Sequence, residues 1–153
     1  MEQSEITAFR TKLLQAKKVG LDSMVFLYHF ADHPQYASYT EIVFQLMEEG
    51  KLSAVTSTIT VSELFVRAEE KNDQMTILAY EQFLKTLPHL EILPVDWYLA
   101  RLAAKLRANY PLLRLPDALQ LSAPLLRGYP VFITNDKKMK KVKEIEVITF
   151  DKQ

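Results

Sequence analysis

The sequence predicts a three-layer α/β/α domain built on a mostly parallel, five-stranded sheet. Short apolar runs of strand length alternate along the chain with longer segments whose apolar residues recur at helical spacing. Such alternation is typical of βαβ units, which place helices on both faces of a sheet. The chain has 153 residues, enough for one sizeable core, and shows neither a repeat nor an internal linker. We therefore expect residues 1–153 to form a single domain.

The first half of the chain begins with an expected extra helix at the N-terminus. Ile6, Phe9 and Leu13 fall on one face of that helix. Pro34 breaks the third expected element, and Gly50 is placed to end the fourth. In order, the expected elements are a helix over about 5–15, a strand over 19–21, helices over 23–30 and 36–49, a strand over 52–57 and a helix over 60–70.

The second half repeats the alternation. Leu99, Leu102 and Leu106 align on one helix face, and Pro88 stops the helix before the third strand. Pro124 lies inside a helical pattern, where we expect it to kink the helix or loosen its last turn. The expected elements are a helix over 73–87, a strand over 90–93, helices over 96–108 and 117–127, a strand over 131–133 and a last strand over 147–150.

Four acidic residues lie where strands give way to helices. Asp22 follows the first strand, and Glu63 is expected in the first turn of the helix after the second strand. Asp117 is expected to start a helix, and Asp136 lies just beyond the strand over 131–133. Ligands of open α/β sheets bind outside the carboxyl ends of the strands. We therefore expect the four carboxylates to meet at that edge of the sheet.

Taken one at a time, each acid also has a purely structural explanation. Asp22 fits a helix N-cap, and Asp117 fits the favourable place for a negative charge beside a helix N-terminus. Glu63 completes a capping box over 60–63 and could pair with Arg67 one turn on. Asp136 follows an asparagine in a common turn pair.

Taken together, the acids indicate a metal site. Carboxylates this close cannot all stay ionised without a cation between them. The chain has no cysteine, and its three histidines are scattered, so thiolate zinc sites are excluded and no histidine site is apparent. Mg²⁺ and Mn²⁺ prefer oxygen ligands. With only three glycines and no phosphate-binding glycine loop, metal-assisted phosphodiester hydrolysis is the expected chemistry.

Charge and hydropathy limit the remaining function classes. Lysine plus arginine equal aspartate plus glutamate, so the total charge does not identify a nucleic-acid binder. Five lysines nevertheless crowd residues 137–143, directly after Asp136; they form either a solvated face or a patch that contacts phosphates. No apolar run reaches membrane-span length and no signal peptide is recognisable, so no membrane partner is expected and a cytoplasmic location fits.

The same four positions resemble the acidic motifs of PIN-domain ribonucleases, including VapC-type toxins. Residues 19–23 (Val-Gly-Leu-Asp-Ser) resemble the family's first strand, and residues 60–64 (Thr-Val-Ser-Glu-Leu) its Thr-x-x-Glu motif. Residues 115–118 (Leu-Pro-Asp-Ala) and 134–136 (Thr-Asn-Asp) resemble its third and fourth motifs. The four occur in order between about 18 and 150. The extra N-terminal helix, Leu115 and Pro124 depart from the pattern, but no acid is missing.

The resemblance implies a Mg²⁺- or Mn²⁺-dependent endoribonuclease that is often dimeric. Many such proteins are toxins silenced by a small antitoxin protein whose C-terminal segment reaches the acidic pocket. Arg114, beside the expected site, is either a phosphate contact or part of a surface ion pair. By resemblance, the catalytic metal ligands would be Asp22, Glu63, Asp117 and Asp136, supported by the polar residues Ser23 and Thr134.

Two alternatives belong to other classes. The chain could be a PIN scaffold that binds RNA or protein without cutting, although retention of all four acids argues against this. It could also be a phosphoacceptor receiver domain, which is doubly wound and has an acidic pocket as well. A receiver needs an aspartate at the end of its third strand and a lysine after its fifth; residues 93–96 (Leu-Pro-Val-Asp) fit poorly, and no suitable lysine is found.

Overall fold

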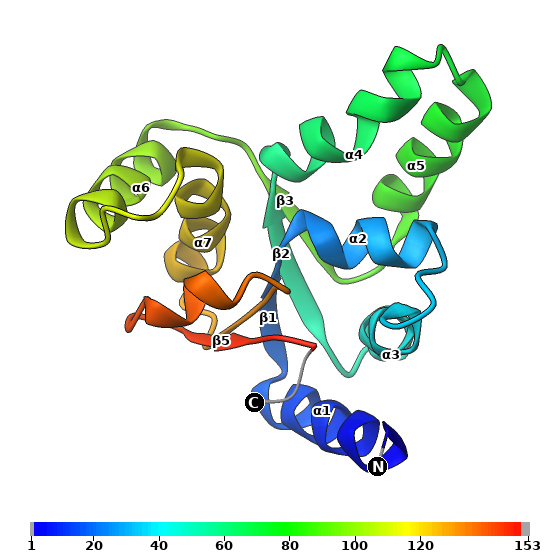
Figure 1. Cartoon of the computed structure of the whole chain (residues 1–153), viewed down its shortest axis with the longest axis horizontal. Coiled ribbons are helices and arrows are strands. Elements are labelled where there is room, and N and C mark those ends of the chain that lie inside the picture. Colours follow the sequence, from blue (N-terminus) through cyan, green and yellow to red (C-terminus); the bar gives the residue numbers. More distant parts are fainter. Residues whose placement is uncertain (1, 151–153) are drawn as a thin grey trace.

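The computed structural model describes residues 2–150 and shows one five-stranded sheet between two groups of helices (Figure 1). In chain order the elements are α1 (Glu2–Ala16), β1 (Lys18–Leu21), α2 (Ser23–Phe30), α3 (Ala37–Glu48), β2 (Ser53–Ser57), α4 (Thr58–Glu70), α5 (Gln74–Thr86), β3 (Leu90–Leu93), α6 (Trp97–Asn109), α7 (Leu115–Arg127), β4 (Val131–Ile133), the 3₁₀ helix η1 (Lys137–Lys141) and β5 (Glu146–Ile148).

The strand order of the sheet is β3-β2-β1-β4-β5, and all four neighbouring pairs are parallel. The central strand β1 therefore lies between β2 and β4. The flavodoxin-like order of receiver domains, 2-1-3-4-5, would instead place β3 beside β1. The observed order excludes the receiver alternative.

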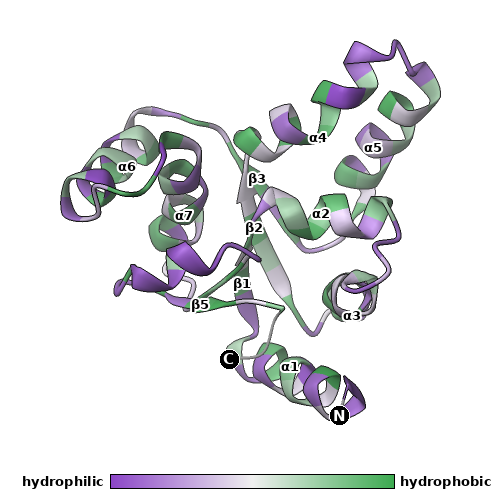
Figure 2. Ribbon diagram, in the orientation of Figure 1, coloured by the Kyte–Doolittle hydropathy of each residue, from purple (hydrophilic) through white to green (hydrophobic). Residues whose placement is uncertain are grey.

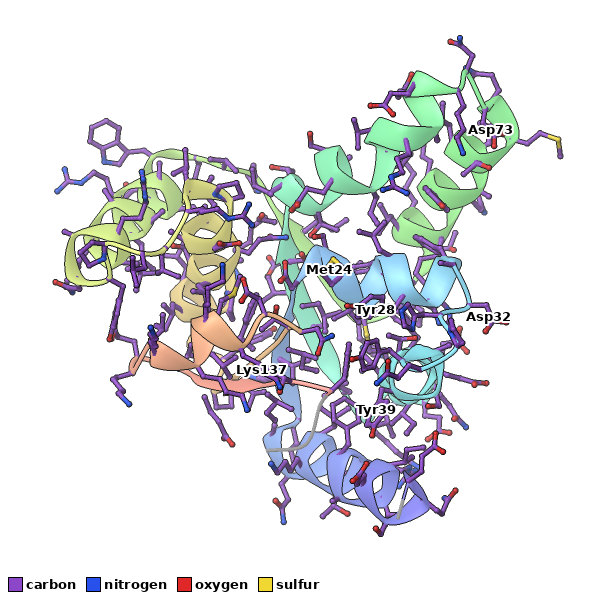
Figure 3. The ribbon with its side chains drawn as sticks, viewed as in Figure 1. Met24, Tyr28, Asp32, Tyr39, Asp73 and Lys137 are labelled. Atoms are coloured by element: carbon purple, nitrogen blue, oxygen red, sulfur yellow. The ribbon has the colours of Figure 1, made fainter. Side chains whose placement is uncertain are left out.

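Two hydrophobic cores cover the two faces of the sheet. Val19 and Leu21 of β1 belong to the core beneath α1–α5, whereas Phe132 of β4 and Val55 of β2 belong to the core beneath α6 and α7. Figure 1 shows the same division, with α6 and α7 on one side of the sheet and α2–α5 on the other, and Figure 3 labels Tyr28 and Tyr39 on the side of α2 and α3. The predicted three-layer α/β/α fold is confirmed.

Several element boundaries differ from those expected. The N-terminal helix spans Glu2–Ala16, longer than the predicted 5–15, and β5 ends at Ile148, two residues before the predicted end. The short helix η1 was not expected, because its five residues carry too few apolar positions to show a period. Within residues 2–150, no helix is both long and apolar enough to cross a bilayer.

The helix α7 continues through Pro124 to Arg127, so the expected loosening of its last turn is wrong. Gly128 ends the helix at φ 68°. Its N–H donates to Leu125 O at 3.2 Å, and the Tyr129 N–H donates to Pro124 O at 2.9 Å. These two bonds form the Schellman motif that closes many helix C-termini.

Pro124 explains why a glycine stands in the middle of β1. A Cβ atom at Gly20 would overlap Pro124 Cγ and would lie 2.7 Å from Pro124 Cβ. Only a residue without a side chain lets β1 and α7 approach this closely. The proline ring therefore packs directly on the strand backbone.

We expect Gly20→Ala to lower the free energy of unfolding by about 1–3 kcal/mol, the usual cost of overpacking a core. Urea denaturation measures the change. In a Pro124→Ala background the ring atoms are absent, so the cost of Gly20→Ala should fall. An equal cost in both backgrounds would show that this close approach does not decide which residue stands at position 20.

Candidate active site

Asp22 lies between the end of β1 and the start of α2, at the carboxyl edge of the sheet. Its side chain is 7% exposed. Oδ1 accepts a hydrogen bond from the Ser23 N–H at 2.8 Å, and Oδ2 accepts one from Thr134 Oγ1 at 2.6 Å. Met24, the next residue of α2, is labelled at this edge in Figure 3. Two short bonds thus hold the carboxylate in one orientation.

Thr134 connects the acids that follow β1 and β4. Its hydroxyl donates to Asp22 and accepts a hydrogen bond from the Asp136 N–H at 3.1 Å. Asp136 in turn accepts a bond at Oδ1 from the Lys138 N–H at 3.0 Å, which caps η1. One buried hydroxyl therefore bonds both the Asp22 carboxylate and the backbone of Asp136.

Glu63 reaches the site from α4, but not from the first turn of that helix. The helix begins at Thr58 because the Ser57 side chain caps it, accepting from the Ile59 N–H at 3.2 Å. The expected start at Thr60 and the capping box are therefore wrong. Ser23 Oγ donates to Glu63 Oε1 at 3.2 Å, which links α2 to α4. Within residues 2–150, no ion pair joins Glu63 to Arg67.

Asp117 is the third residue of α7, which starts at Leu115 rather than at Asp117 as expected. Arg114, the exposed residue before this helix, donates from Nε to Asp117 Oδ2 at 3.2 Å and from Nη2 to Oδ1 at 3.4 Å. Arg114 is thus a surface ion-pair partner in this structure. The pair neutralises Asp117 in part, while Asp117 itself is mostly buried.

The electrostatics connect three of the acids directly, Asp22, Glu63 and Asp117, and connect Asp136 through Arg114. Burial raises the pKa of Asp22 to about 6; the bonds from Thr134 and Ser23 oppose this shift, and the charges of Glu63 and Asp117 add to it. Desolvation is also the main cause that raises the pKa of Glu63, with Asp117 contributing. The pKa of Arg114 is raised mainly by Asp117 and further by Asp136 and Glu63. Asp22, Glu63 and Asp117 therefore lie near enough to influence one another's charge, and Asp136 is linked to them by the Asp22–Thr134 bond and through Arg114.

The structural explanations of the acids are correct in part. Asp22 and Asp136 both accept bonds from backbone N–H groups at the start of a helix. A carboxylate has about four acceptor positions, however, so such bonds leave capacity for a further ligand. Glu63 lies inside α4 and accepts from the Ser23 hydroxyl instead of from a helix end. Holding helix ends does not account for all four acids.

The donor chemistry fits a hard divalent cation, because a buried carboxylate with a raised pKa gains from a positive partner when it ionises. Within residues 2–150, no three acidic, histidine or cysteine side chains lie close enough together to hold an ion by themselves. Mg²⁺ usually takes only one or two carboxylates and completes its shell with water and substrate phosphate. The arrangement thus suits an ion shared with a substrate.

A buried polar network behind the acids was missed by the sequence reasoning. Gln120 lies one turn after Asp117 on α7; its Nε2 donates to Thr60 Oγ1 at 2.7 Å, and its Oε1 accepts from Ser57 Oγ at 2.6 Å. Thr60 also bonds the Thr56 hydroxyl at 2.7 Å. One side chain therefore fixes α7, which carries Asp117, against α4, which carries Glu63. The available signal was a glutamine in an otherwise apolar helical run.

We expect Gln120→Leu to destabilise the fold by about 1–3 kcal/mol, because the buried Ser57 and Thr60 hydroxyls each lose a partner. Thermal unfolding monitored by circular dichroism measures this. Ser122→Ala is the matched control, since Ser122 is also buried on α7 but donates to Ala118 O on its own helix, at 2.7 Å. Equal losses for the two variants would contradict a special role for the network.

Comparisons with known proteins agree with this architecture. A model of the PIN domain matches residues 19–145. No curated protein sequence matches the chain. Among solved structures, VapBC2 from Rickettsia felis bound to a promoter DNA fragment is similar with a TM-score of 0.69 at 19% identity, covering 88% of this chain and 99% of that one.

Two further structures are similar at the same level. DNA-bound VapBC from Salmonella typhimurium has a TM-score of 0.68 at 20% identity, covering 88% of this chain and 98% of its own. A toxin–antitoxin complex from Klebsiella pneumoniae has a TM-score of 0.62 at 22% identity, covering 89% and 99%. At such identities the likeness concerns the fold. The PIN domain model matches most of this chain. The chain therefore belongs to the PIN domain family, whose members are nucleases.

Proposed function

We propose that the chain is a Mg²⁺- or Mn²⁺-dependent endoribonuclease whose metal ligands are Asp22, Glu63, Asp117 and Asp136. The observation that carries the proposal is the environment of Asp22. Its carboxyl is buried, bonded in a fixed orientation and surrounded by the negative charges of Glu63 and Asp117. Without a metal ion, keeping these carboxylates ionised at neutral pH is unfavourable, because they are desolvated and repel one another. A bound divalent cation would offset both effects.

Each residue has a distinct part in the proposed reaction. A bound divalent ion would polarise the phosphodiester and activate water for in-line attack. Ser23 and Thr134 orient the carboxylates of Asp22 and Glu63, so that little rearrangement is needed when substrate binds. Arg114 lies at the rim, exposed, and can leave Asp117 to hold a phosphate of the substrate.

We further propose that the protein is the toxin of a toxin–antitoxin pair. The support is that the Rickettsia felis, Salmonella typhimurium and Klebsiella pneumoniae structures with this fold are VapBC or toxin–antitoxin complexes. A small antitoxin protein would then cover the acidic site, and the toxin would work in the cytoplasm as a homodimer. A short reading frame encoded directly upstream of this one would support the pairing.

One observation favours a second candidate, a PIN scaffold that binds RNA or protein without cutting. Arg114 already pairs with Asp117. Within residues 2–150, no three possible metal ligands lie close enough together to hold an ion. A binding-only scaffold needs no cation, so a titration with Mn²⁺ separates the two functions. Saturable binding of Mn²⁺ that Glu63→Gln weakens is expected of the nuclease and not of the scaffold.

The direct test is cleavage of a panel of structured RNAs by the purified protein. We expect strand breaks in single-stranded or loop regions with added Mn²⁺ or Mg²⁺ and none with EDTA. Cleavage that persists in EDTA would refute the metal dependence. No cleavage of any RNA in either metal would leave the binding scaffold as the function.

A further inference from the structure

The lysine segment, residues 137–143, forms a cationic surface directly beside the acidic site. Met139 and Val142 of this segment are buried in the core beneath α6 and α7, whereas Lys138, Lys141 and Lys143 are exposed. Figure 2 shows η1 in the hydrophilic colour, and Figure 3 labels Lys137 at its start. The segment begins one residue after Asp136, whose carboxylate caps it. The fold therefore places the lysine segment directly after Asp136, one of the candidate site acids.

Part of this positive charge is not neutralised. Elsewhere, basic residues pair with acids, as Lys51 does with Glu49 and Lys85 with Glu81. In the described chain, residues 2–150, Lys138 makes no side-chain ion pair, and the same holds for Lys141 and Lys143. Exposed cations without acidic partners suit an anionic ligand such as a phosphate backbone.

A pocket of about 180 Å³ separates the lysine segment from the loop between α6 and α7. Tyr110, Leu112 and Leu113 line it from the loop, and Lys138 and Lys141 line it from the lysine segment. In a cleft of this kind, a nucleotide base can pack against the apolar side chains while its phosphates contact the lysines. The remaining lining residues are Asn109, Pro111 and Val142.

Hydrogen bonds hold the shape of the pocket, because they connect the loop between α6 and α7 with the lysine segment and with α6. Tyr110 Oη donates to Glu144 Oε1 at 2.6 Å and accepts from the Lys143 N–H at 3.0 Å. Arg107 Nε donates to Leu113 O at 3.3 Å and holds the loop to α6. The loop leads directly into Arg114, and the lysine segment leads back to Asp136. Both the loop and the lysine segment therefore continue into the candidate active site.

We propose that this pocket and the lysine segment bind a nucleotide of single-stranded RNA next to the bond that is cut. Its base enters the apolar pocket and its phosphates contact Lys138 and Lys141. Bases of a duplex are stacked and paired, whereas those of single strands and loops can be splayed into such a cleft. The inference rests on the proposed nuclease function and names the substrate contact of the same site.

The test is RNA binding measured by fluorescence anisotropy in EDTA, with a short labelled single-stranded RNA, over a series of salt concentrations. For single strands the logarithm of the binding constant falls with the logarithm of salt by about 0.7 per phosphate contact, so Lys138→Ala with Lys141→Ala should flatten the slope by about 1.4. Lys12→Ala with Lys71→Ala removes the same charge from α1 and from the end of α4, and should leave the slope unchanged.

The pocket itself is tested by Leu112→Glu, which places a negative charge at the rim. Leu112 is 78% exposed, so the fold should tolerate the change, and RNA affinity should drop. Leu78→Glu, at a leucine that is 62% exposed on α5, is the matched control and should keep the wild-type affinity.

An unchanged salt slope in the double lysine variant overturns the proposal, as does equal RNA affinity of Leu112→Glu and wild type. A slope change seen with single-stranded DNA but not with RNA overturns RNA as the ligand. Because the readout needs no cleavage, a wild type that binds RNA through these residues without cutting it would refute the nuclease and leave the binding surface intact.

Discussion

Asp117→Asn is expected to lower the rate of metal-dependent RNA cleavage by about three orders of magnitude. The substitution keeps the shape of the side chain but removes one of the negative charges that would hold the cation. The charge stabilisation supplied by such an ion is worth several kcal/mol, and each 1.4 kcal/mol changes a rate roughly tenfold. The fold should survive, since the partner that Asp117 would lose is the exposed Arg114, and exposed ion pairs contribute little to stability.

Initial rates in saturating Mn²⁺, with thermal unfolding measured beside them, check this result. Glu70→Gln is the control: it removes the same charge from an exposed position on α4, remote from the acids, and should cut RNA at the wild-type rate. If Asp117→Asn retains wild-type activity in purified protein, Asp117 has no role as a metal ligand.

The metal-free protein is expected to lose stability as the pH rises from about 4 to above 6, because of Asp22. Burial raises the pKa of this carboxyl to about 6 in the folded chain, from 3.8 for an ordinary aspartate. Between these values the folded state binds more protons than the unfolded state, so the free energy of unfolding falls with increasing pH. A difference of about two pKa units corresponds to roughly 3 kcal/mol.

Asp22→Asn should remove most of this dependence and raise the stability of the metal-free protein at pH 7. The gain should be smaller than the full 3 kcal/mol or so, since the amide replaces one of the two oxygens that accept bonds from Ser23 and Thr134. Urea unfolding at a series of pH values in EDTA gives the measurement. A variant whose stability has the wild-type slope over this range would show that Asp22 ionises at an ordinary pKa.

The boundaries of the elements illustrate how local signals compete. The pattern around residues 60–63 resembled a helix start, yet the helix begins at Thr58 because Ser57 caps it first. Thr60 is then free to bond Gln120 inside the protein. Both serine and threonine are good caps, and only the packing of α4 against α7 selects between them. A helix start that depends on this competition between two caps cannot be predicted from the local sequence alone.

The sequence by itself determined the alternation of strands and helices, the parallel α/β class and the acids Asp22 and Asp136 just beyond strands, because these follow from spacing within short segments. The tertiary structure decided the strand order, the place of Pro124 against Gly20, and the network through Gln120. It also joined Asp22 to Thr134, residues 112 positions apart. Such contacts depend on which distant surfaces pack together, and that is a property of the whole core rather than of any one segment.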